Sequence, residues 1–251
     1  MSGRPSIIGL IPARAGSQRI KDKNIVQLQG HPLIAYSVCA ALDSGVFDAV
    51  VASTDSQLYA DIARHYGAEA PFLRPVEMAG SKSPDIEWVR YTLERLAALG
   101  RAYDSFSILR PTSPFRLPQT IQRAWGEFLA QEGVDSLRAV EKCKQHPGKM
   151  WVVRGQRMTP LLPLTPPARP WHSSQYADLP EVYVQNASLE IAWSRVALEE
   201  GTIAGNVLMP FFTQGSEGWD INHPEDVWIA ERLLAEGQAR LPVVGPPPWR
   251  G

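Results

Sequence analysis

The chain has 251 residues, of which 44% are hydrophobic, and this is enough for one large domain or a domain with a small appendage. Its formal net charge of −1 argues against a nucleic-acid partner, because nucleic-acid-binding domains are normally basic. The two cysteines, Cys39 and Cys143, fit neither a zinc site nor a disulfide framework, and no signal-peptide core or membrane-spanning apolar run is present. We therefore expect a cytoplasmic protein with no membrane partner.

The first half of the chain alternates between strand and helix patterns. Short apolar runs predict buried strands at residues 7–11, 49–53 and 104–109. Helical periodicity predicts helices at residues 32–42, 56–66 and 118–131, and one that opens at residues 83–87 with Ser83 as its N-cap. Strands that alternate with helices form mostly parallel sheets with helices on both faces, so the predicted class is α/β.

The sequence changes character after about residue 142. Six prolines fall between residues 147 and 171, where little periodicity is present, which predicts an insertion that runs over the surface. We place this subdomain insertion at about residues 142–195 of a single domain that spans 1–251. The remaining patterns predict strands at 188–193 and 207–209, a helix at 224–236, and a Pro-rich tail at 240–251 that is loose or becomes ordered on docking.

A basic loop follows the first predicted strand, which ends at Pro12 and Gly16. Its cationic side chains are Arg14, Arg19, Lys21 and Lys23. A small-residue loop at the carboxyl end of a strand lets backbone N–H groups approach an anion, and basic side chains then offset the charge of a polyphosphate. Neither the GxGxxG nor the GxxxxGK[ST] pattern is present, so spacing alone leaves two interpretations, a phosphate site and a solvated basic loop.

Residues 11–24, IPARAGSQRIKDKN, closely resemble the opening signature of the sugar-acid cytidylyltransferases, which include the acylneuraminate enzymes that make CMP-sialic acid. Further segments resemble the family in its order: 53–55 (STD), 73–75 (LRP), 110–116 (RPTSPFR) and 219–222 (WDIN), followed by Glu231. The resemblance covers about residues 6–236. It implies a Rossmann-like fold with a mostly parallel mixed sheet flanked by helices, and a homodimer formed through a small protruding dimerisation subdomain. It also implies an enzyme that converts CTP and a sugar acid into a CMP-sugar and pyrophosphate, with Mg²⁺ as cofactor.

The resemblance assigns Arg14 and Lys23 to the pair that grips the phosphates, where they would act as catalytic residues by offsetting charge on the leaving pyrophosphate. Asn24 and Arg74 match positions near the base and ribose. The residues expected to bind the nucleotide are Ala13, Arg14, Gly16, Ser17, Lys23, Asn24, Arg74 and Ser83. Residues 78–83 depart from the family pattern, with Lys82 unexpected there, so another nucleoside triphosphate stays an alternative to CTP.

Asp220 is the candidate metal ligand and catalytic carboxylate, because Mg²⁺ prefers carboxylate and phosphate oxygens. The family usually carries Asp-Ile-Asp here, two acids on one side of a strand, whereas this chain carries Asp220-Ile221-Asn222. Asn222 offers a neutral oxygen and is the second candidate ligand. Asn222-His223-Pro224 is also predicted to form the N-terminal cap of the helix that follows, and we expect this role to hold beside the metal role.

The residues expected to bind the acceptor are Asp55, Arg110, Thr112, Gln175, Tyr176 and Asn186. Arg116 is expected to be structural. Tyr176 stands where relatives have an arginine that would pair with the carboxylate of the sugar acid. This exchange predicts poor use of N-acetylneuraminate and better use of a modified nonulosonate, an eight-carbon ulosonate or a neutral sugar. His172, Lys149 and Gln175 are alternative partners for the acceptor.

The sequence thus predicts in-line attack of an acceptor hydroxyl on the α-phosphorus of CTP, which needs no protein nucleophile. No Ser/His/Asp or Cys/His arrangement is apparent. Two alternatives remain at this level. One is an enzyme of the same fold that uses another nucleotide or a neutral sugar, and the other is a non-catalytic nucleotide-binding protein.

Overall fold

The computed structural model describes residues 3–162 and 169–250. The chain divides into two compact units, each described here by itself. The main unit comprises Met1–Ala139 with Asn186–Gly251, and the small unit comprises Val140–Gln185. No helix in the described parts of the chain is both long enough and apolar enough to cross a membrane.

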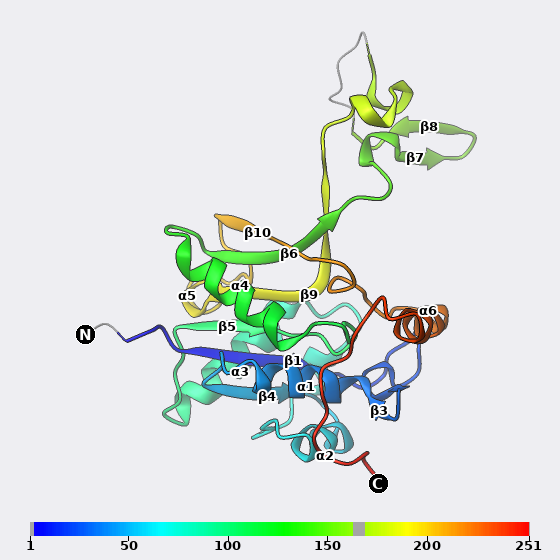
Figure 1. Ribbon diagram of the computed structural model, residues 1–251. Coiled ribbons are helices and arrows are strands. Elements are labelled where there is room, and N and C mark those ends of the chain that lie inside the picture. The colour runs from blue at the N-terminus through cyan, green and yellow to red at the C-terminus, as the bar shows by residue number, and fades with distance from the viewer. Residues whose placement is uncertain (1–2, 163–168, 251) are drawn as a thin grey trace. The chain divides into compact units, whose positions relative to one another are not determined.

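A six-stranded sheet forms the centre of the main unit (Figure 1). Its strands, in spatial order, are β10 (Leu208–Phe212), β6 (Ser136–Lys142), β9 (Tyr183–Trp193), β5 (Ser105–Ile108), β1 (Ile7–Pro12) and β4 (Ala49–Ser53). β1 pairs in parallel with β4 and with β5, whereas β9 runs antiparallel to β5. The sheet is therefore mixed.

Helices cover both faces of this sheet (Figure 1). The helices on one face are α1 (Leu33–Asp43), α2 (Gln57–His65) and α4 (Pro118–Ala130). The helices on the other face are α3 (Asp85–Ala98) and α5 (Ser194–Leu198). The predicted Rossmann-like α/β class, with a mostly parallel mixed sheet flanked by helices, is confirmed.

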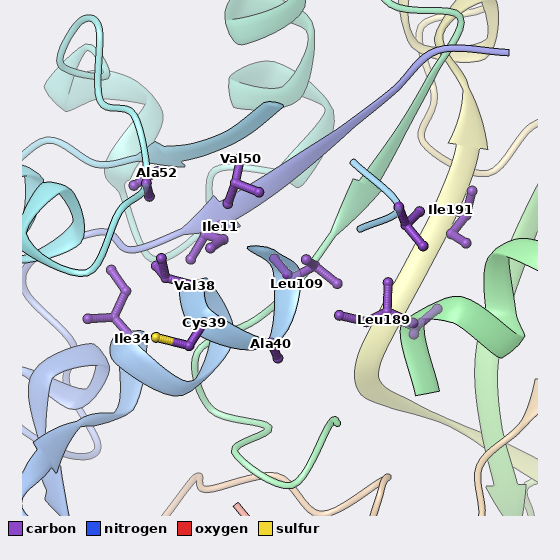
Figure 2. Close-up of a cluster of buried hydrophobic side chains, with 14 of the residues drawn as sticks. Ile11, Ile34, Val38, Cys39, Ala40, Val50, Ala52, Leu109, Leu189 and Ile191 are labelled. Carbon is purple, nitrogen blue, oxygen red and sulfur yellow. The ribbon is translucent and has the colours of Figure 1, made fainter. Parts of the chain in front are cut away.

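Alternation along β1 separates two hydrophobic clusters. Ile7 and Ile11 belong to the cluster on the α1 face, and Ile8 and Leu10 belong to the cluster on the α3 face. Successive side chains of a strand point to opposite faces, so a strand covered on both faces is apolar throughout. Figure 2 shows Val38 of α1 beside Ile11 in the first of these clusters.

A third cluster joins the C-terminal helix α6 (Pro224–Ala235) to the segment after the basic loop. Ile221 and Ala230 share this cluster with Leu28 and Phe115. The small elements that follow the basic loop are η1 (Lys23–Ile25), β2 (Gln27–Leu28) and β3 (His31–Pro32). Burial of Ile221 therefore brings the 219–222 segment to the N-terminal part of the chain.

Two local predictions differ from the structure. Pro84, and not Ser83, is the N-cap residue of α3, because the Ser83 hydroxyl donates instead to the carbonyl of Glu77 at 2.9 Å. Strand β6 was not predicted at all. Its apolar pattern is interrupted by Arg138, which the fold buries in an ion pair with Glu190.

The Pro-rich tail is docked on the main unit. The backbone N–H of Trp249 donates to the hydroxyl of Tyr66 at 3.1 Å, and His65 Nε2 lies 2.7 Å from the carbonyl oxygen of Pro247. Val244 and Trp249 pack against the hydrophobic cluster on the α1 face. Of the two expected states of the tail, loose or docked, the structure therefore shows the docked one.

The small unit contains regular structure where the sequence predicted an irregular insertion. β7 (Trp151–Arg154) and β8 (Arg157–Pro160) form an antiparallel hairpin whose turn includes Gly155 at φ 61°. Its 3-10 helices are η3 (Pro147–Lys149), η4 (Trp171–Ser173) and η5 (Tyr176–Asp178). Part of the proline-rich stretch, residues 163–168, lies outside the described residues. The role of this region in dimerisation stays a prediction.

Candidate active site

A pocket of about 150 Å³ lies in the main unit, beside the carboxyl ends of β1 and β5, where open α/β sheets bind ligands. It is lined by Pro12, Arg14, Ser17, Lys23, Asn24, Arg74, Asp85, Trp88, Arg110, Pro111 and Thr112. Seven of these eleven residues were predicted as site residues: Arg14, Ser17, Lys23, Asn24, Arg74, Arg110 and Thr112. The pocket thus unites nucleotide-binding and acceptor-binding candidates that lie far apart in the sequence.

Two hydrogen bonds and one glycine hold the basic loop in shape. The backbone N–H of Ala15 donates to Oδ1 of Asp55 at 2.8 Å, just beyond the end of β4. Asn24 Nδ2 donates to the carbonyl of Arg14 at 3.0 Å, which closes the loop on itself. Gly16 adopts φ 72°, a left-handed conformation that suits glycine. The loop is therefore an ordered part of the pocket wall.

Arg14 and Lys23 supply positive charge to the pocket from the two sides of the loop. Arg14 Nη1 donates to the carbonyl of Ala79 at 3.3 Å, in the 3-10 helix η2 (Val76–Ala79). Burial lowers the pKa of Lys23, and the charges of Arg19, Arg14 and Arg110 lower it further, whereas Asp220 opposes them. A cation whose charge is disfavoured by burial and by its cationic neighbours gains from a bound polyanion.

Arg74 and Trp88 form another part of the pocket wall. Arg74 is only 4% exposed, and its Nε and Nη2 donate to Oγ and the carbonyl oxygen of Ser53 at 3.1 and 2.8 Å. Its guanidinium carbon lies 4.7 Å from the centroid of the Trp88 ring. Burial lowers the pKa of Arg74 to about 10, so it remains charged at neutral pH. This rigid stack is a flat surface of the kind that can contact a base or ribose.

Arg110 links two carboxylates at the end of β5. Its Nη2 donates to Oδ2 of Asp85 at 2.6 Å and to Oε1 of Glu190 at 2.9 Å. Glu190 is buried and also forms an ion pair with Arg138. Trp88 Nε1 donates to the other carboxylate oxygen of Asp85 at 2.7 Å. Arg110 is therefore held in place by α3 and β9 together.

Sequence reasoning missed Asp85, Trp88 and Glu190 as parts of this site. Asp85 lies in the first turn of a predicted helix, where an acid is ordinary, and Trp88 stands in no motif. Glu190 lies in a predicted strand with no motif around it. The one usable signal was a glutamate at a position where alternation predicts burial, since buried acids are normally paired.

Asp220 and Asn222 meet the basic loop beside this pocket. Asn222 Nδ2 donates to Oδ2 of Asp220 at 2.5 Å, and Lys23 Nζ donates to Oδ1 of Asn222 at 3.2 Å. The other carboxylate oxygen of Asp220, Oδ1, is buried and has no hydrogen-bond partner among the described residues. A buried carboxylate oxygen without a donor is costly unless a cation or a ligand completes it.

The N-terminal helix cap predicted for Asn222-His223-Pro224 is confirmed. His223 is the N-cap of α6, and Asp226 completes the capping box by accepting from the backbone N–H groups of Asn222 and His223, both at 2.7 Å. The side chain of Asn222 therefore remains available to Lys23 and Asp220.

Asp220 and Asn222 fit a magnesium site that has few protein ligands. The described residues contain no group of three or more His, Cys, Asp or Glu side chains that could hold a metal ion. Magnesium, however, commonly uses one or two protein carboxylates and takes its other ligands from water and substrate phosphates. The unpartnered Oδ1 of Asp220, whose charge acts on Lys23 of the basic loop, fits that pattern.

Several predicted residues of the main unit do not line the pocket. Ala13 is fully buried, and its backbone N–H donates to the carbonyl of Ser53 at 3.0 Å. Asp55 anchors the loop through Ala15, and Gly16 shapes it. Ser83 lines a separate shallow depression with Lys82 and Glu87. Asn186 Nδ2 donates to Thr213 Oγ1 at 2.9 Å. For Asp55 and Gly16 the structure indicates support of the site through the loop.

Arg116, which follows the Pro-Thr-Ser-Pro turn, has the expected structural role. Its side chain is buried and donates to Oγ of Ser37 at 2.7 Å and to the carbonyls of Arg110 and Ser188. These contacts brace the segment that carries Arg110 and Thr112. The backbone carbonyl of Thr112 also accepts from the N–H of Ile221 at 2.8 Å, which fixes the neighbouring Asp220.

The remaining acceptor candidates, Gln175 and Tyr176, lie in the small unit. Tyr176 is 57% exposed, and Lys149 Nζ lies 5.2 Å from its ring centroid. Lys149 also donates to the carbonyl of Ser174 at 2.6 Å and is close to that of His172. In this unit the lysine considered as a substitute for the missing arginine is therefore already bound to backbone carbonyls.

Comparisons with known proteins agree with this arrangement. Residues 8–127 match the family described as Cytidylyltransferase. The chain is 34% identical over 242 residues to the CMP-N,N'-diacetyllegionaminic acid synthase of Legionella pneumophila, a match that covers 94% of this chain and 99% of that one. It is 36% identical over 132 residues to a pseudaminic acid cytidylyltransferase of Campylobacter jejuni, covering 53% of this chain and 57% of that one.

Solved structures agree on the fold. A CMP:2-keto-3-deoxy-manno-octonic acid synthetase complexed with CTP superposes with a TM-score of 0.67 at 13% identity, over 92% of this chain and 99% of that chain. At 13% identity this similarity establishes the fold alone. The family is established by the legionaminic acid synthase, which matches along nearly its whole length. This chain is an enzyme of the cytidylyltransferase family.

Proposed function

We propose that this enzyme transfers the cytidylyl group of CTP to a nonulosonic sugar acid, giving a CMP-sugar and pyrophosphate. The observation that carries the proposal is the contact between Lys23 Nζ and Asn222 Oδ1 at 3.2 Å. It joins the basic loop to the segment that holds Asp220, so cationic groups that line the pocket lie beside the carboxylate that we propose as the metal ligand. The names of its relatives, which include a legionaminic acid synthase and a pseudaminic acid cytidylyltransferase, support the substrate class.

In this mechanism the acceptor hydroxyl attacks the α-phosphorus and pyrophosphate leaves on the opposite side. Arg14 and Lys23 bind the phosphates and offset the charge that accumulates on the leaving group. Arg74 and Asn24 orient the nucleoside against the Trp88 wall. Arg110 and Thr112 position the acceptor. Alignment of the two substrates and stabilisation of charge on the leaving group account for the rate acceleration, and no covalent enzyme intermediate is required.

We further propose that Asp220 holds Mg²⁺ through its unpartnered Oδ1, with Asn222 orienting this carboxylate. The metal ion, when bound, would polarise the α-phosphoryl group and neutralise part of its charge. Lys23 then contributes to both the phosphate site and the metal site, since it binds phosphate and holds the side chain of Asn222 in place. The fit of the donor set supports this assignment.

We also propose a homodimer in the cytoplasm, formed through the small unit. Exposed apolar side chains gather on this unit, and they include Met150, Trp151, Val153, Met158, Leu161 and Tyr176. Exposed apolar surface of this kind is usual at interfaces between proteins. Sedimentation of the purified protein would test the dimer, and a monomer at micromolar concentration would contradict it.

The function is tested by pyrophosphate release with each of the four nucleoside triphosphates against a panel of acceptors. The panel contains N,N'-diacetyllegionaminate, pseudaminate, N-acetylneuraminate, 2-keto-3-deoxy-manno-octonate and a neutral hexose. We expect turnover with CTP and a nonulosonate, and loss of turnover when Mg²⁺ is chelated. Preference for another nucleotide or for the hexose would refute the proposal.

A further inference from the structure

The chemistry of a ulosonic acid constrains where its carboxylate is bound, and this argument rests on the proposed function. In the ring form of such an acid, the anomeric carbon carries both the reacting hydroxyl and the carboxylate. The carboxylate therefore lies next to the attacking oxygen, close to the α-phosphate. Two negative groups at such short range repel each other unless a cation lies between them or beside them. The partner of the carboxylate must then belong to the phosphate pocket itself.

Four cationic side chains line this pocket. Three of them already have another role, either in binding the phosphates of CTP or in contacts within the protein. Arg14 and Lys23 belong to the phosphate loop. Arg74 is almost fully buried and is bound to Ser53 and stacked on Trp88. The fourth is Arg110, at the carboxyl end of β5, whose side chain is 28% exposed.

The hydrogen bonds of Arg110 leave part of its guanidinium available. Its contacts with Asp85 and Glu190 both involve Nη2. Within the described residues, neither Nη1 nor Nε of Arg110 donates a hydrogen bond. A guanidinium carries five N–H donors. The two ion pairs therefore fix the orientation of the group and leave other donors available for a ligand.

The charge balance around Arg110 also favours an incoming anion. Its immediate carboxylates are Asp85 and Glu190, and the cations around them are Arg74, Arg110 and Arg138. Burial by itself would raise the pKa of Asp85, but the charge and hydrogen bond of Arg110 and the hydrogen bond of Trp88 outweigh burial and lower it, so Asp85 is ionised. The charges of Asp55 and Arg14 also act on Arg74. Four positive groups thus face three negative ones, which leaves one positive charge for a ligand.

We propose that Arg110 is the residue that binds the carboxylate of the acceptor, and that Asp85 and Glu190 position it for this task. Arg110 would then fill, from the end of β5, the role that the family resemblance implies for an arginine at the place of Tyr176. A planar guanidinium held by two carboxylates is preorganised, so little side-chain freedom is lost when the acceptor binds. Asp85 and Glu190 act only through Arg110 and are positioning residues.

The test compares an acid with its methyl ester, which keeps the reacting hydroxyl and lacks the negative charge. The probe is N,N'-diacetyllegionaminate, or whichever acid of the panel the wild type turns over best. We expect the wild type to prefer the acid over the ester by about 10- to 100-fold in kcat/KM, the range for a hydrogen bond to a charged group. Arg110→Gln should bring this ratio close to one while leaving the affinity for CTP unchanged.

Arg123 offers a matched control. Its side chain is 27% exposed and also pairs with two carboxylates, those of Glu127 and Glu217, but it does not line the pocket. Arg123→Gln should keep the wild-type preference for the acid. An equal fall in kcat/KM for acid and ester in Arg110→Gln would show a merely structural role, and a large loss of CTP affinity would assign Arg110 to the nucleotide. Either result would overturn the proposal.

A second variant covers the case in which Arg110→Gln does not fold. Asp85→Asn keeps the shape of a half-exposed side chain and removes one of the charges that hold Arg110. We expect a higher KM for the acid, an unchanged KM for the ester and a smaller preference for the acid. An unaltered preference in Asp85→Asn would refute its positioning role. Absence of turnover with every acid by the wild type would refute the proposed function, and the role of Arg110 with it.

Discussion

The phenol of Tyr59 on α2 donates a hydrogen bond of 2.8 Å to Oδ1 of Asp22 and so ties this helix to the end of the basic loop. Asp22 has a left-handed backbone, with φ 53°, a conformation that few residues other than glycine adopt without cost. Burial raises the pKa of Tyr59, and its hydrogen bond to Asp22 raises it further, so the phenol stays a protonated donor throughout the physiological range. The contact therefore orders the loop from outside the pocket.

Replacing Tyr59 by Phe should loosen the basic loop. We expect the free energy of unfolding to fall by about 1 kcal/mol, as for one lost hydrogen bond, and the affinity for CTP to fall with it. Urea unfolding and calorimetry measure the two effects. Tyr36→Phe is a suitable control, because its phenol donates to the carbonyl of Leu28, which lies outside the loop. Equal losses of CTP affinity in both variants would contradict a specific role for Tyr59.

Arg14→Ala should weaken nucleotide binding and leave the fold intact. Among the described residues its side chain makes one hydrogen bond, to the carbonyl of Ala79, which is long at 3.3 Å, so the free energy of unfolding should change by less than about 1 kcal/mol. The CTP affinity should fall by about 10- to 100-fold, which corresponds to one charge-assisted contact. Lys21→Ala removes a cation of the same loop that does not line the pocket and should have a smaller effect. Unchanged CTP affinity in Arg14→Ala would remove this residue from the phosphate site.

The proposed metal site gives opposite expectations for its two residues. Asp220→Asn should nearly abolish activity at any Mg²⁺ concentration. Asn222→Asp should lower the Mg²⁺ concentration for half-maximal rate, because a second carboxylate replaces the amide that now donates to Asp220. The two carboxylates would repel each other without metal, so Mg²⁺ should raise the Tm of this variant more than that of the wild type. Loss of activity in Asn222→Asp would instead point to a specific need for the amide between Lys23 and Asp220.

Tyr176 is expected to shape acceptor choice. A phenol offers an apolar face with one polar tip, so we expect the wild type to use N,N'-diacetyllegionaminate better than N-acetylneuraminate. Tyr176→Arg should narrow that preference by about tenfold, the scale of a single pocket contact. Competition assays with both acids measure the ratio, with Tyr183→Arg as a control on the same unit. Efficient use of N-acetylneuraminate by the wild type would show that the exchange at position 176 does not discriminate.

Asp85 should contribute to stability in a pH-dependent way. Its pKa in the folded state is below the ordinary value, since Arg110 and Trp88 outweigh burial. The stabilisation is then complete above the unfolded pKa of about 4 and is lost as pH falls through the folded pKa. Asp85→Asn should therefore be less stable than the wild type at pH 7, by about 1 kcal/mol for a half-exposed pair, and equal to it in strong acid. A difference that persists unchanged at low pH would contradict the ion pair as its source.

Much of the fold was predictable because its signals are local. The apolar run of β1 and the periodicity of α1, α2 and α4 depend on neighbouring residues, and the strand–helix alternation then implies the sheet. β6 escaped prediction because Arg138, a buried charge, breaks its apolar pattern. The ion pair with Glu190 and a hydrogen bond to the carbonyl of Ile203 make that burial tolerable. The hairpin of the small unit escaped because prolines and exposed side chains obscure its alternation.

The sequence by itself determined the basic loop, the family resemblance and the pocket residues Arg14, Lys23, Asn24, Arg74, Arg110 and Thr112. Each stands in a short motif, and a motif can be identified from the sequence without knowledge of its tertiary contacts. Only the tertiary structure decided that Asp85 and Glu190 meet at Arg110, and that Asp55 supports the loop. It also decided that the side chain of Asn222 contacts Lys23 and Asp220 while His223 caps the helix. Periodicity reports whether a side chain is buried, but its partner is set by how helices and strands distant in sequence pack, and no local pattern encodes that choice.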